Sequence, residues 1–442
     1  MTFSGLGDAL EWLDSHQNLE RMLAVAPERR KAPDLDRMRR LMEALGNPQE
    51  SCPVVHVTGT NGKTSTARCI ATMFTKMGLR VGLFTSPHLE SINERIEADG
   101  SVIDDATLLS ALSTLAGIEA LVAPAEGFTW FELITAAAFV CFADRPVDVM
   151  VLEVGMGGRW DATNVADAVV AVVTNVGLDH LEFLGPTREH VAREKAGVVK
   201  AGSTLVLGEV EENLVEIFEG QSPDAVWLAG KDWDCATNDP TPEGRILDLR
   251  TPSASYEQVR LSLHGPHQGR NFAAALAAVE AFFGRRIDEH LVRAAAAGVS
   301  SPGRMEIVGS EPTIVLDGAK NLEGATAAGH ALLEEFTFRS SLIMVVGMLA
   351  GKDPGSMLSA LGARQARLVV ACRAPSPRSQ PAEDVAQAAR ALGCEAVVAG
   401  DVAEALEEAL RFARPDDLIF VTGSLYVVGA ARAALSARRR AL

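Results

Sequence analysis

Residues 54–65 read VVHVTGTNGKTS, an apolar run followed by a short loop and then Gly-Lys-Thr-Ser. This order predicts a strand that ends near Val57, a phosphate-binding loop and a helix that begins near Lys63. Glycine lets the backbone approach phosphate oxygens closely, and the N–H groups at the start of a helix attract an anion. Only two residues separate Gly59 from Gly62, a shorter spacing than in the common phosphate loop, so we interpret this loop as a variant. A strand–helix turn that binds no ligand is the alternative.

The side chains of this loop indicate how it would bind ATP. Lys63 can reach the terminal phosphates, and the hydroxyl of Thr64 or Ser65 can contact Mg²⁺. The candidate ATP ligands within the loop are Gly59, Thr60, Asn61, Gly62, Lys63, Thr64 and Ser65.

Short apolar runs alternate with helix-like segments after this loop, which is typical of a parallel sheet with crossover helices. The N-terminal part contains predicted strands at 54–57, 81–84, 147–152, 169–174 and 204–207. Two helices are expected before them: one contains Leu10 and Leu13 and reaches Leu23, and the other is capped by Asp34 and ends at Gly46. Further along, 220–256 predicts irregular or short antiparallel structure, and 271–283 predicts an alanine-rich helix.

A second series of strands and helices follows in the C-terminal part of the chain. Its predicted strands lie at 313–316, 342–346, 368–371, 396–398 and 418–421. Residues 300–303, SSPG, are typical of a linker. We therefore predict an α/β protein with a phosphate-loop domain of mostly parallel sheet over 1–299 and a smaller Rossmann-like α/β domain over 300–442. A chain of 442 residues is also too long for one ordinary core.

The composition is that of a globular protein, with 48% hydrophobic and 22% charged residues. A formal net charge of −17 argues against a broad surface for nucleic acid or membrane. The six cysteines form no CxxC pair and no zinc-like spacing, which indicates a reduced cytoplasmic protein. Acidic residues interrupt the apolar pattern of 1–14, unlike a signal peptide, and no uninterrupted apolar run reaches the roughly 18 residues that span a membrane.

Polar side chains directly follow several predicted strands, at the sheet edge where ligands gather in open α/β folds. These side chains are Ser86, Glu153 and His180. Phosphoryl transfer needs a cation to neutralise phosphate oxygens, and a buried carboxylate is costly unless it is paired or bound to metal. We therefore expect Ser86, Glu153, His180 and Thr64 to be Mg²⁺ ligands. A Ser-Pro turn at Ser86 and an ordinary surface histidine at His180 are the alternatives.

Taken in order, the motifs resemble those of the folylpolyglutamate synthase/dihydrofolate synthase family, a branch of the Mur ligase superfamily, and the actinobacterial type is most similar. The resemblance covers nearly the whole chain and includes 56–65, 85–89, Phe131-Glu132 with Thr135, EVGMGGRWDATN at 153–164, 178–180, 194–197, 267–271, 301–304, 316–319 and 421–426. It implies a Mur-ligase-like phosphate-loop domain in a cytoplasmic monomer. It also implies ATP, Mg²⁺ at two sites and a monovalent cation.

The resemblance implies nucleotide contacts outside the loop. Asn271 would contact the adenine, Arg304 the phosphates from across the domain cleft, and Asp317 the ribose or phosphate side. A folate-type acid would contact residues on the opposite side of the site: Asp34, Thr129, Phe131, Glu132, Trp160, Asp161 and Ala162.

The resemblance also implies metal ligands. Ser86 and Glu153 would hold one Mg²⁺, and Glu153 with His180 would help to hold a second. Lys195 matches a lysine that is carbamylated in this family, although by itself it reads as a solvated helix lysine. A carbamate would supply anionic oxygens to a cation that a bare ammonium repels.

One position departs from the family pattern. Residues 317–321 read DGAKN, whereas the family usually has histidine at the position of Lys320. Lys320 keeps a positive charge but lacks a titratable imidazole. Either this lysine serves equally well beside the other expected catalytic residues, which are Lys63, Lys195 and Arg304, or it changes the amine substrate.

The implied reaction joins a pterin or folate carboxylate to the amine of L-glutamate. The carboxylate would attack the γ-phosphorus of ATP to give an acyl phosphate and ADP, and the amine would then displace phosphate. This route needs no protein nucleophile. Two alternatives remain open from the sequence: a paralogous Mur-type amide ligase with a different acid or amine, and a catalytically silent ATP-binding homologue.

Overall fold

The computed structural model describes residues 3–18, 35–123, 127–336 and 341–441. Its largest sheet has eight strands in the order β4-β3-β2-β5-β1-β6-β7-β8. The strands from β2 to β8 in this order are parallel, whereas β3 and β4 form an antiparallel edge. The strands span β1 Val54–Thr58, β2 Val81–Phe84, β3 Ile96–Ala98, β4 Ser101–Val102, β5 Val149–Glu153, β6 Ala168–Asn175, β7 Thr204–Glu209 and β8 Ala225–Leu228.

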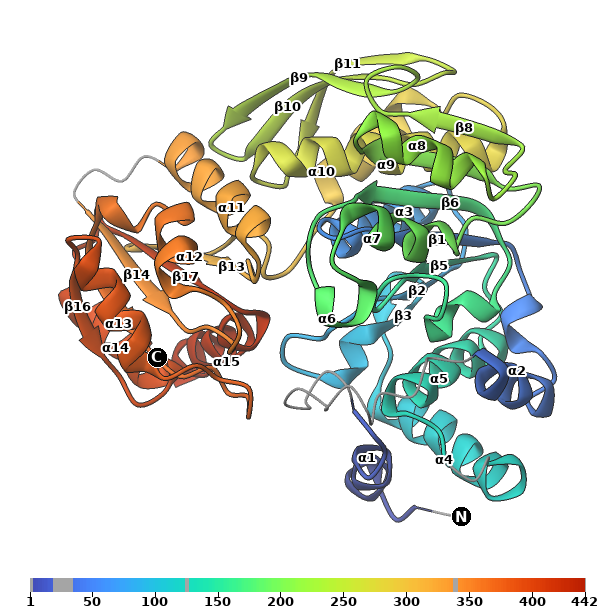
Figure 1. The fold of residues 1–442 in the computed structure, drawn as a ribbon, viewed down its shortest axis with the longest axis horizontal. Coiled ribbons are helices and arrows are strands. Elements are labelled where there is room, and N and C mark those ends of the chain that lie inside the picture. The colour runs from blue at the N-terminus through green and yellow to red at the C-terminus, as the bar shows by residue number, and fades with distance from the viewer. Residues whose placement is uncertain (1–2, 19–34, 124–126, 337–340, 442) are drawn as a thin grey trace.

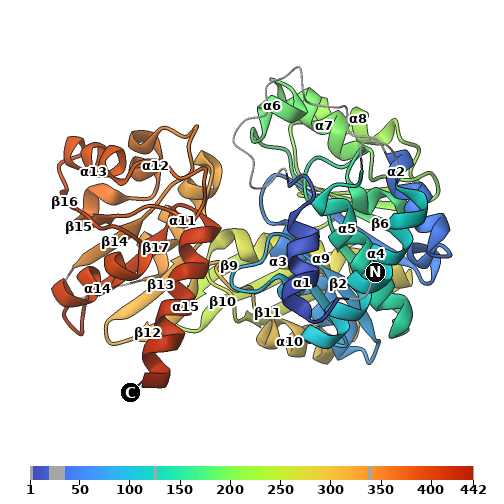
Figure 2. The ribbon, with the colours of Figure 1, turned by 90° about the horizontal axis from the view of Figure 1, so that it is seen from below.

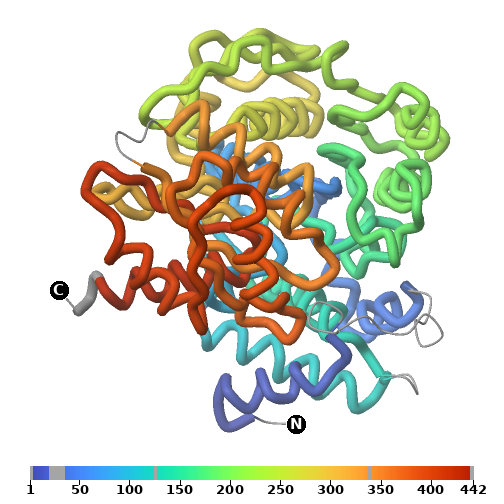
Figure 3. The backbone as a smooth tube through the Cα atoms, turned by 60° about the vertical axis from the view of Figure 1, so that its left-hand side comes forward, coloured from blue at the N-terminus to red at the C-terminus, as the bar shows by residue number. Residues whose placement is uncertain are grey.

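The C-terminal part forms a second sheet of six strands, in the order β12-β13-β17-β14-β15-β16, with β12 antiparallel to β13 and the other neighbours parallel. A three-stranded antiparallel sheet of β9, β10 and β11 lies between the two sheets in sequence. Figure 1 shows the second sheet and its helices as a separate lobe, and Figure 3 shows this lobe in front of the first sheet. The bounds are β9 Asp234–Thr241, β10 Gly244–Arg250, β11 Ser255–Leu261, β12 Glu306–Ser310, β13 Thr313–Asp317, β14 Leu342–Val346, β15 Ala366–Ala371, β16 Glu395–Val398 and β17 Leu418–Thr422.

Helices connect and cover the sheets. Those in the first part are α1 Leu6–Asp14, α2 Leu35–Ala44, α3 Lys63–Lys76, α4 Asp105–Val122, α5 Trp130–Asp144, α6 Leu181–Leu184, α7 Arg188–Ala196, α8 Glu212–Glu219, α9 Pro266–Phe283 and α10 Glu289–Gly298. Those in the C-terminal lobe are α11 Leu322–Glu335, α12 Pro354–Ala360, α13 Ala382–Ala391, α14 Val402–Phe412 and α15 Leu425–Ala441. Short 3₁₀ helices are η2 Pro48–Glu50, η3 Ile92–Arg95, η4 Ala162–Val165 and η5 Ala363–Gln365.

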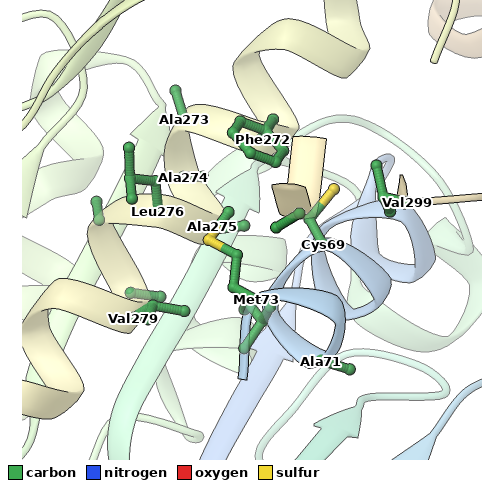
Figure 4. Packing of buried hydrophobic residues seen from close by; sticks show 14 of the residues in the cluster. Cys69, Ala71, Met73, Phe272, Ala273, Ala274, Ala275, Leu276, Val279 and Val299 are labelled. Atoms are coloured by element: carbon green, nitrogen blue, oxygen red, sulfur yellow. The ribbon is translucent and has the colours of Figure 1, made fainter. Parts of the chain in front are cut away.

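The packing of α3 against α9 positions the phosphate loop. One face of β1 contributes Val55 and Val57 to the apolar core that these two helices share, and the other face contributes Val54 to a core with α4 and α5. Figure 4 shows Cys69 and Met73 of α3 beside the buried residues of α9, which include a run of small alanines, Ala273 to Ala275. Interiors packed this closely move little. The start of α3 and the first turns of α9 therefore hold a fixed relative position.

The sequence predictions of class and strands agree with the structure. The segments 81–84 and 342–346 coincide with β2 and β14. The antiparallel alternative for 220–256 is confirmed by β9 to β11, except that residues 225–228 form β8, which pairs in parallel with β7. The alanine-rich helix begins at Pro266, earlier than predicted, because proline fits the first turn of a helix, where its missing N–H is not needed. The predicted extension of the first helix to Leu23 and the cap at Asp34 lie outside the described residues.

Within the described ranges, α4 is the single helix that is long and apolar enough to cross a membrane by length and composition. Ser, Thr and Glu interrupt its apolar residues, which is why the sequence shows no continuous run. The helix packs against α1, α2 and α5. It also contributes Leu108, Leu112 and Leu115 to the core beneath the first sheet. With 28% of its residues buried, α4 is partly packed on the core.

The two lobes are joined by a buried charged cluster at the C-terminal end of α11. The Glu335 carboxylate, whose side chain is 0% exposed, pairs with Arg245 of β10, whose side chain is 1% exposed. The same carboxylate accepts hydrogen bonds from the Gly265 backbone N–H at 2.9 and 3.0 Å and contacts His264 Nδ1 at 3.2 Å. Figures 1 and 2 both show α11 on the side of the C-terminal lobe that faces the rest of the chain. A buried carboxylate with this many partners is well satisfied.

His56 of β1 has a strongly perturbed titration. Its side chain is fully buried, and its Nε2 lies 2.8 Å from Thr163 Oγ1. Burial, with a smaller contribution from the charge of Lys200, lowers the pKa of His56 from 6.5 to about 3. The folded protein therefore keeps this ring neutral at pH values where the unfolded chain protonates it.

We expect this difference to weaken the fold in mild acid. Below pH 6.5 the unfolded chain binds a proton at His56 that the folded chain does not, so the free energy of unfolding falls as the pH falls from 6.5 towards 3. One such group contributes a slope of at most about 1.4 kcal/mol per pH unit. His56→Gln is expected to make the slope shallower, as measured by urea unfolding between pH 7.5 and 5. The control is His290→Gln, at a surface histidine, and an unchanged slope in His56→Gln would contradict the assignment.

Candidate active site

The phosphate loop has the geometry that its sequence predicts. It connects the end of β1 to the start of α3, with Gly62 at the helix N-cap in a left-handed conformation of φ 84°. A Cβ atom on Gly62 would lie 2.5 Å from Asn271 Oδ1, and one on Gly59 would lie 1.8 Å from Thr174 Oγ1. Both positions therefore require glycine. Because Gly62 has no side chain to cap α3, the first N–H groups of this helix are available to an anion.

Lys63 folds back over this loop. Its Nζ donates hydrogen bonds to the carbonyl oxygens of Gly59, at 3.0 Å, and Thr60, at 3.4 Å. Burial lowers the pKa of Lys63, and the negative charge of Glu153 opposes this shift. The ammonium group thus lies at the mouth of the loop, where the phosphates of a nucleotide would meet it.

Oxygen atoms from neighbouring strand ends converge beside the loop. Glu153, at the end of β5, is 1% exposed. Its Oε1 accepts a hydrogen bond from Thr64 Oγ1 at 2.8 Å, and its Oε2 accepts one from the Ser86 backbone N–H at 3.0 Å. Burial raises the pKa of Glu153, while Lys63 lowers it. A hard cation such as Mg²⁺ prefers oxygen ligands of this kind, so Thr64, Ser86 and Glu153 fit one divalent site.

His180 lies in a different arrangement, next to Asp179 and two lysines. Lys320 Nζ is 3.4 Å from His180 Nε2 and 3.9 Å from Asp179 Oδ2. Lys352 Nζ is 3.3 Å from Asp179 Oδ1. Burial, followed by the charge of Lys320, lowers the pKa of His180 to about 3. Burial raises the pKa of Asp179, but the charges of Lys320, His180 and Lys352 lower it by more. The net pKa therefore lies well below its usual range.

The His180 cluster spans the two lobes. Asn321, the N-cap of α11, donates hydrogen bonds to Asp179 Oδ2 and to Asn61 Oδ1, both at 3.1 Å. In the part of the chain that the structure describes, no three His, Cys, Asp or Glu side chains gather as a metal site. The expected pairing of His180 with Glu153 at a second cation stays a prediction.

Lys195 lies at the end of α7, where it is 2% exposed. Burial lowers the pKa of Lys195 well below its usual value, and the nearby charge of Lys63 adds to the shift. The described lining of the cavity does not include Lys195. Only the unprotonated amine reacts with CO₂, and the lowered pKa favours that form.

Arg304, Asp317 and Asn271 face the loop from the second lobe and from α9. Asp317 Oδ1 and Oδ2 accept hydrogen bonds from the backbone N–H groups of Ala319, at 2.9 Å, and Met305, at 3.0 Å. Burial raises the pKa of Asp317, and the charge of Arg304 opposes it. All three predicted residues line the same cavity as the phosphate loop.

The other end of the cavity has an aromatic wall, which is formed by Phe131 and Trp160. Phe131 of α5 packs so closely on Gly155 that a Cβ there would lie 2.4 Å from Phe131 Cζ. Trp160 is 45% exposed. Glu132 and Asp161 also line this wall, but their carboxylates are engaged locally. Glu132 forms a capping box with Thr129, and Asp161 accepts a hydrogen bond from the Met156 backbone N–H at 3.0 Å.

A single cavity of about 1720 Å³ connects these parts. It contains most of the predicted site residues: Thr60, Asn61, Gly62, Lys63, Thr64, Ser65, Ser86, Thr129, Phe131, Glu132, Glu153, Trp160, Asp161, Ala162, His180, Asn271, Arg304, Asp317 and Lys320. Among the predicted residues, Gly59 and Lys195 lie just outside its described lining, and Asp34 falls outside the described residues.

Sequence reasoning missed several lining residues. Lys352 lies in the loop after β14, farther from its strand than Ser86 and Glu153 are from theirs. His267, in the first turn of α9, also lines the cavity, and burial lowers its pKa to about 4. In the sequence, only its position next to His180 pointed to Asp179.

A phosphate loop on a parallel sheet, a buried acidic residue beside it and a second α/β lobe across the cavity define a Mur-type ligase. The Mur ligase middle domain model matches residues 57–279, and the model of the Mur ligase glutamate ligase domain matches residues 303–425. The chain belongs to the folylpolyglutamate synthase/dihydrofolate synthase family of the Mur ligase superfamily, whose members are ATP-dependent ligases.

Relatives cover nearly the whole chain. The dihydrofolate synthase/folylpolyglutamate synthase of Mycobacterium tuberculosis is 39% identical over 92% of this chain and 91% of that protein. A structure of Mycobacterium tuberculosis folylpolyglutamate synthase complexed with ADP has a TM-score of 0.89 and 37% identity, and the match covers 97% of this chain and 98% of that one. A bifunctional folylpolyglutamate synthase/dihydrofolate synthase with Mn, AMPPNP and L-glutamate bound has a TM-score of 0.84 and 26% identity, with 98% of both chains covered.

Proposed function

We propose that the chain joins a folate-type carboxylate, from dihydropteroate or a reduced folate, to the amine of L-glutamate, and converts ATP to ADP and phosphate. The observation that carries this proposal is the continuous cavity, which extends from the phosphate loop past Glu153 to the aromatic wall. A ligand with a triphosphate at one end and an acid with an aromatic ring system at the other can meet within it. We further propose a cytoplasmic monomer, without nucleic-acid or membrane partners, divided near residue 300.

The proposed chemistry has two steps. An oxygen of the substrate carboxylate attacks the γ-phosphorus of ATP and breaks its bond to the β-phosphate oxygen, which leaves as ADP. The glutamate nitrogen, as the neutral amine, then attacks the carbonyl carbon of the acyl phosphate, and the carbon–oxygen bond to phosphate breaks as the amide forms. Lys63 and Arg304 line the cavity near the phosphate loop and would neutralise the charge on the transferred group.

The residues that surround the reacting groups have distinct proposed roles. Thr64, Ser86 and Glu153 would hold a divalent cation, which supplies charge neutralisation to the phosphate oxygens. Asn271 and Asp317 would position the nucleoside end of ATP. The aromatic wall formed by Phe131 and Trp160 would bind the ring system of the acid. Closure of the second lobe would exclude water from the acyl phosphate. The monovalent cation remains a prediction.

The test is a ligation assay with dihydropteroate and with tetrahydrofolate, each supplied with L-glutamate, ATP and Mg²⁺. We expect a product heavier by one glutamyl residue, detected by mass spectrometry, with one ADP released per ligation. ADP release only with a different acid or amine would identify a paralogous ligase. Bound nucleotide without turnover of any acid would identify a silent homologue.

We also propose that Lys195 carries a carbamate. Its unprotonated amine would add to CO₂, forming a nitrogen–carbon bond and releasing a proton, so that the buried side chain would become an anion. We expect depletion of CO₂, or Lys195→Gln, to lower ligation by about tenfold or more. The readouts are the rate with and without added bicarbonate and the carbamate signal of ¹³C-labelled bicarbonate in NMR. Lys231→Gln, at a surface lysine, is the control. A full rate without CO₂ would refute the carbamate.

A further inference from the structure

The side chain that faces His180 is a cation. Lys320 Nζ lies 3.4 Å from His180 Nε2. An ammonium group donates hydrogen bonds and accepts none, so Nε2 must be the acceptor in this contact. In a neutral imidazole only one nitrogen has a free lone pair, and the proton then sits on Nδ1. Lys320 therefore engages the one lone pair that the ring could offer to a metal.

Asp179 and Asn321 lie beside Lys320. Asp179 Oδ2 is 3.9 Å from Lys320 Nζ, and its Oδ1 contacts Lys352 Nζ at 3.3 Å. The residue next to Lys320 in the chain, Asn321, is the N-cap of α11 and donates a hydrogen bond to Asp179 Oδ2 at 3.1 Å. The backbone that carries Lys320 is thus fixed at a helix start, and a buried carboxylate attracts its ammonium group.

A second cation beside His180 would meet the charge of Lys320 first. The cavity lining includes four basic side chains near the phosphate loop and His180: Lys63, Arg304, Lys320 and Lys352. The acidic side chains of the same region include Glu153, Asp179, Glu182, Asp317 and Glu323. A metal bound to His180 Nε2 at about 2 Å would come within contact range of the Lys320 ammonium and would be repelled by it.

We propose that the ammonium group of Lys320 takes the place of a second divalent cation beside His180, so that this chain binds its nucleotide with one divalent cation. The inference rests on the proposed use of ATP in this cavity and makes that use more specific. Thr64, Ser86 and Glu153 remain the site of the single cation. Lys320 would then be a residue that determines metal stoichiometry.

The experiment counts Mn²⁺ ions per bound nucleotide. Full-length protein is loaded with AMPPNP in bicarbonate buffer, nucleotide binding is measured by calorimetry, and bound Mn²⁺ is obtained from the loss of the free Mn²⁺ signal in electron paramagnetic resonance. We expect one Mn²⁺ per nucleotide in the wild-type protein and two in Lys320→Ala. Two ions close together would also give a spin-coupled spectrum in the variant.

Two further variants make the result specific to the charge at residue 320. Lys320→Arg keeps the charge, and Lys352→Ala removes the other lysine that contacts Asp179. Both are expected to bind one Mn²⁺. Two ions in the wild-type protein, one ion in Lys320→Ala or two ions in Lys352→Ala would each overturn the proposal. If AMPPNP fails to bind at all, the proposed function itself fails, and calorimetry shows this before any metal is counted.

Discussion

Lys63→Ala is expected to lower kcat for ligation by about 10²- to 10³-fold while the protein remains folded. Lys63 Nζ rests on the Gly59 and Thr60 carbonyls at the mouth of the phosphate loop. It can turn from these neutral acceptors to the phosphates of ATP at little cost. Alanine removes a positive charge from the position where negative charge develops, so the transition state loses more stabilisation than the ground state.

The measurements for this variant are kcat, KM for ATP and the melting temperature. Lys76→Ala is the matched control, since Lys76 lies in the last turn of the same helix, away from the loop. Its kcat should stay near the wild-type value. A Lys63→Ala protein that ligates at the wild-type rate would exclude the phosphate loop as the site of phosphoryl transfer.

Glu153→Gln is expected to reduce ligation by about 10²-fold or more and to raise the Mg²⁺ concentration for half-maximal rate by about tenfold or more. Glutamine has nearly the same shape but no negative charge, and its amide group must place an N–H donor against either Thr64 or the Ser86 backbone N–H. Both of these groups donate to the carboxylate in the native protein.

The same substitution is expected to leave the nucleotide-free protein at least as stable as the wild-type protein. Burial raises the pKa of Glu153, which means that the folded state disfavours its charge relative to the unfolded chain. Removing that charge relieves the penalty. The melting temperature without nucleotide or metal checks this point, with the exposed Glu209→Gln as control. A large loss of stability would show that Glu153 is a structural residue rather than a ligand.

Local patterns in the sequence predicted the first sheet and its phosphate loop well. Apolar runs such as 81–84 have glycine, proline or polar residues at their ends, and a buried parallel strand needs just such a run. Ser86 and Glu153 were identifiable because the carboxyl ends of parallel strands meet at one edge. These residues lie close together because β2, β5 and β1 are neighbours in the sheet.

Contacts between the lobes could not be predicted from such patterns. The distance from Lys320 to His180, and the meeting of Lys352 with Asp179, depend on how two separately folded sheets are placed. No periodicity encodes that placement. The family resemblance implied a second cation at His180, and the sequence showed the unusual Lys320, but the contact between these two residues could not be predicted.

The buried pair of Arg245 and Glu335 determines how the cavity can open. Moving Glu335 away from Arg245 and the Gly265 N–H would leave a buried carboxylate without partners, which is costly. The contacts of Asp179 with Lys320 and Lys352 involve partly exposed lysines and cost less to break. We therefore expect the second lobe to rotate about the contacts of Glu335 while the contacts around Asp179 open. We expect substrates to enter and products to leave past Asp179.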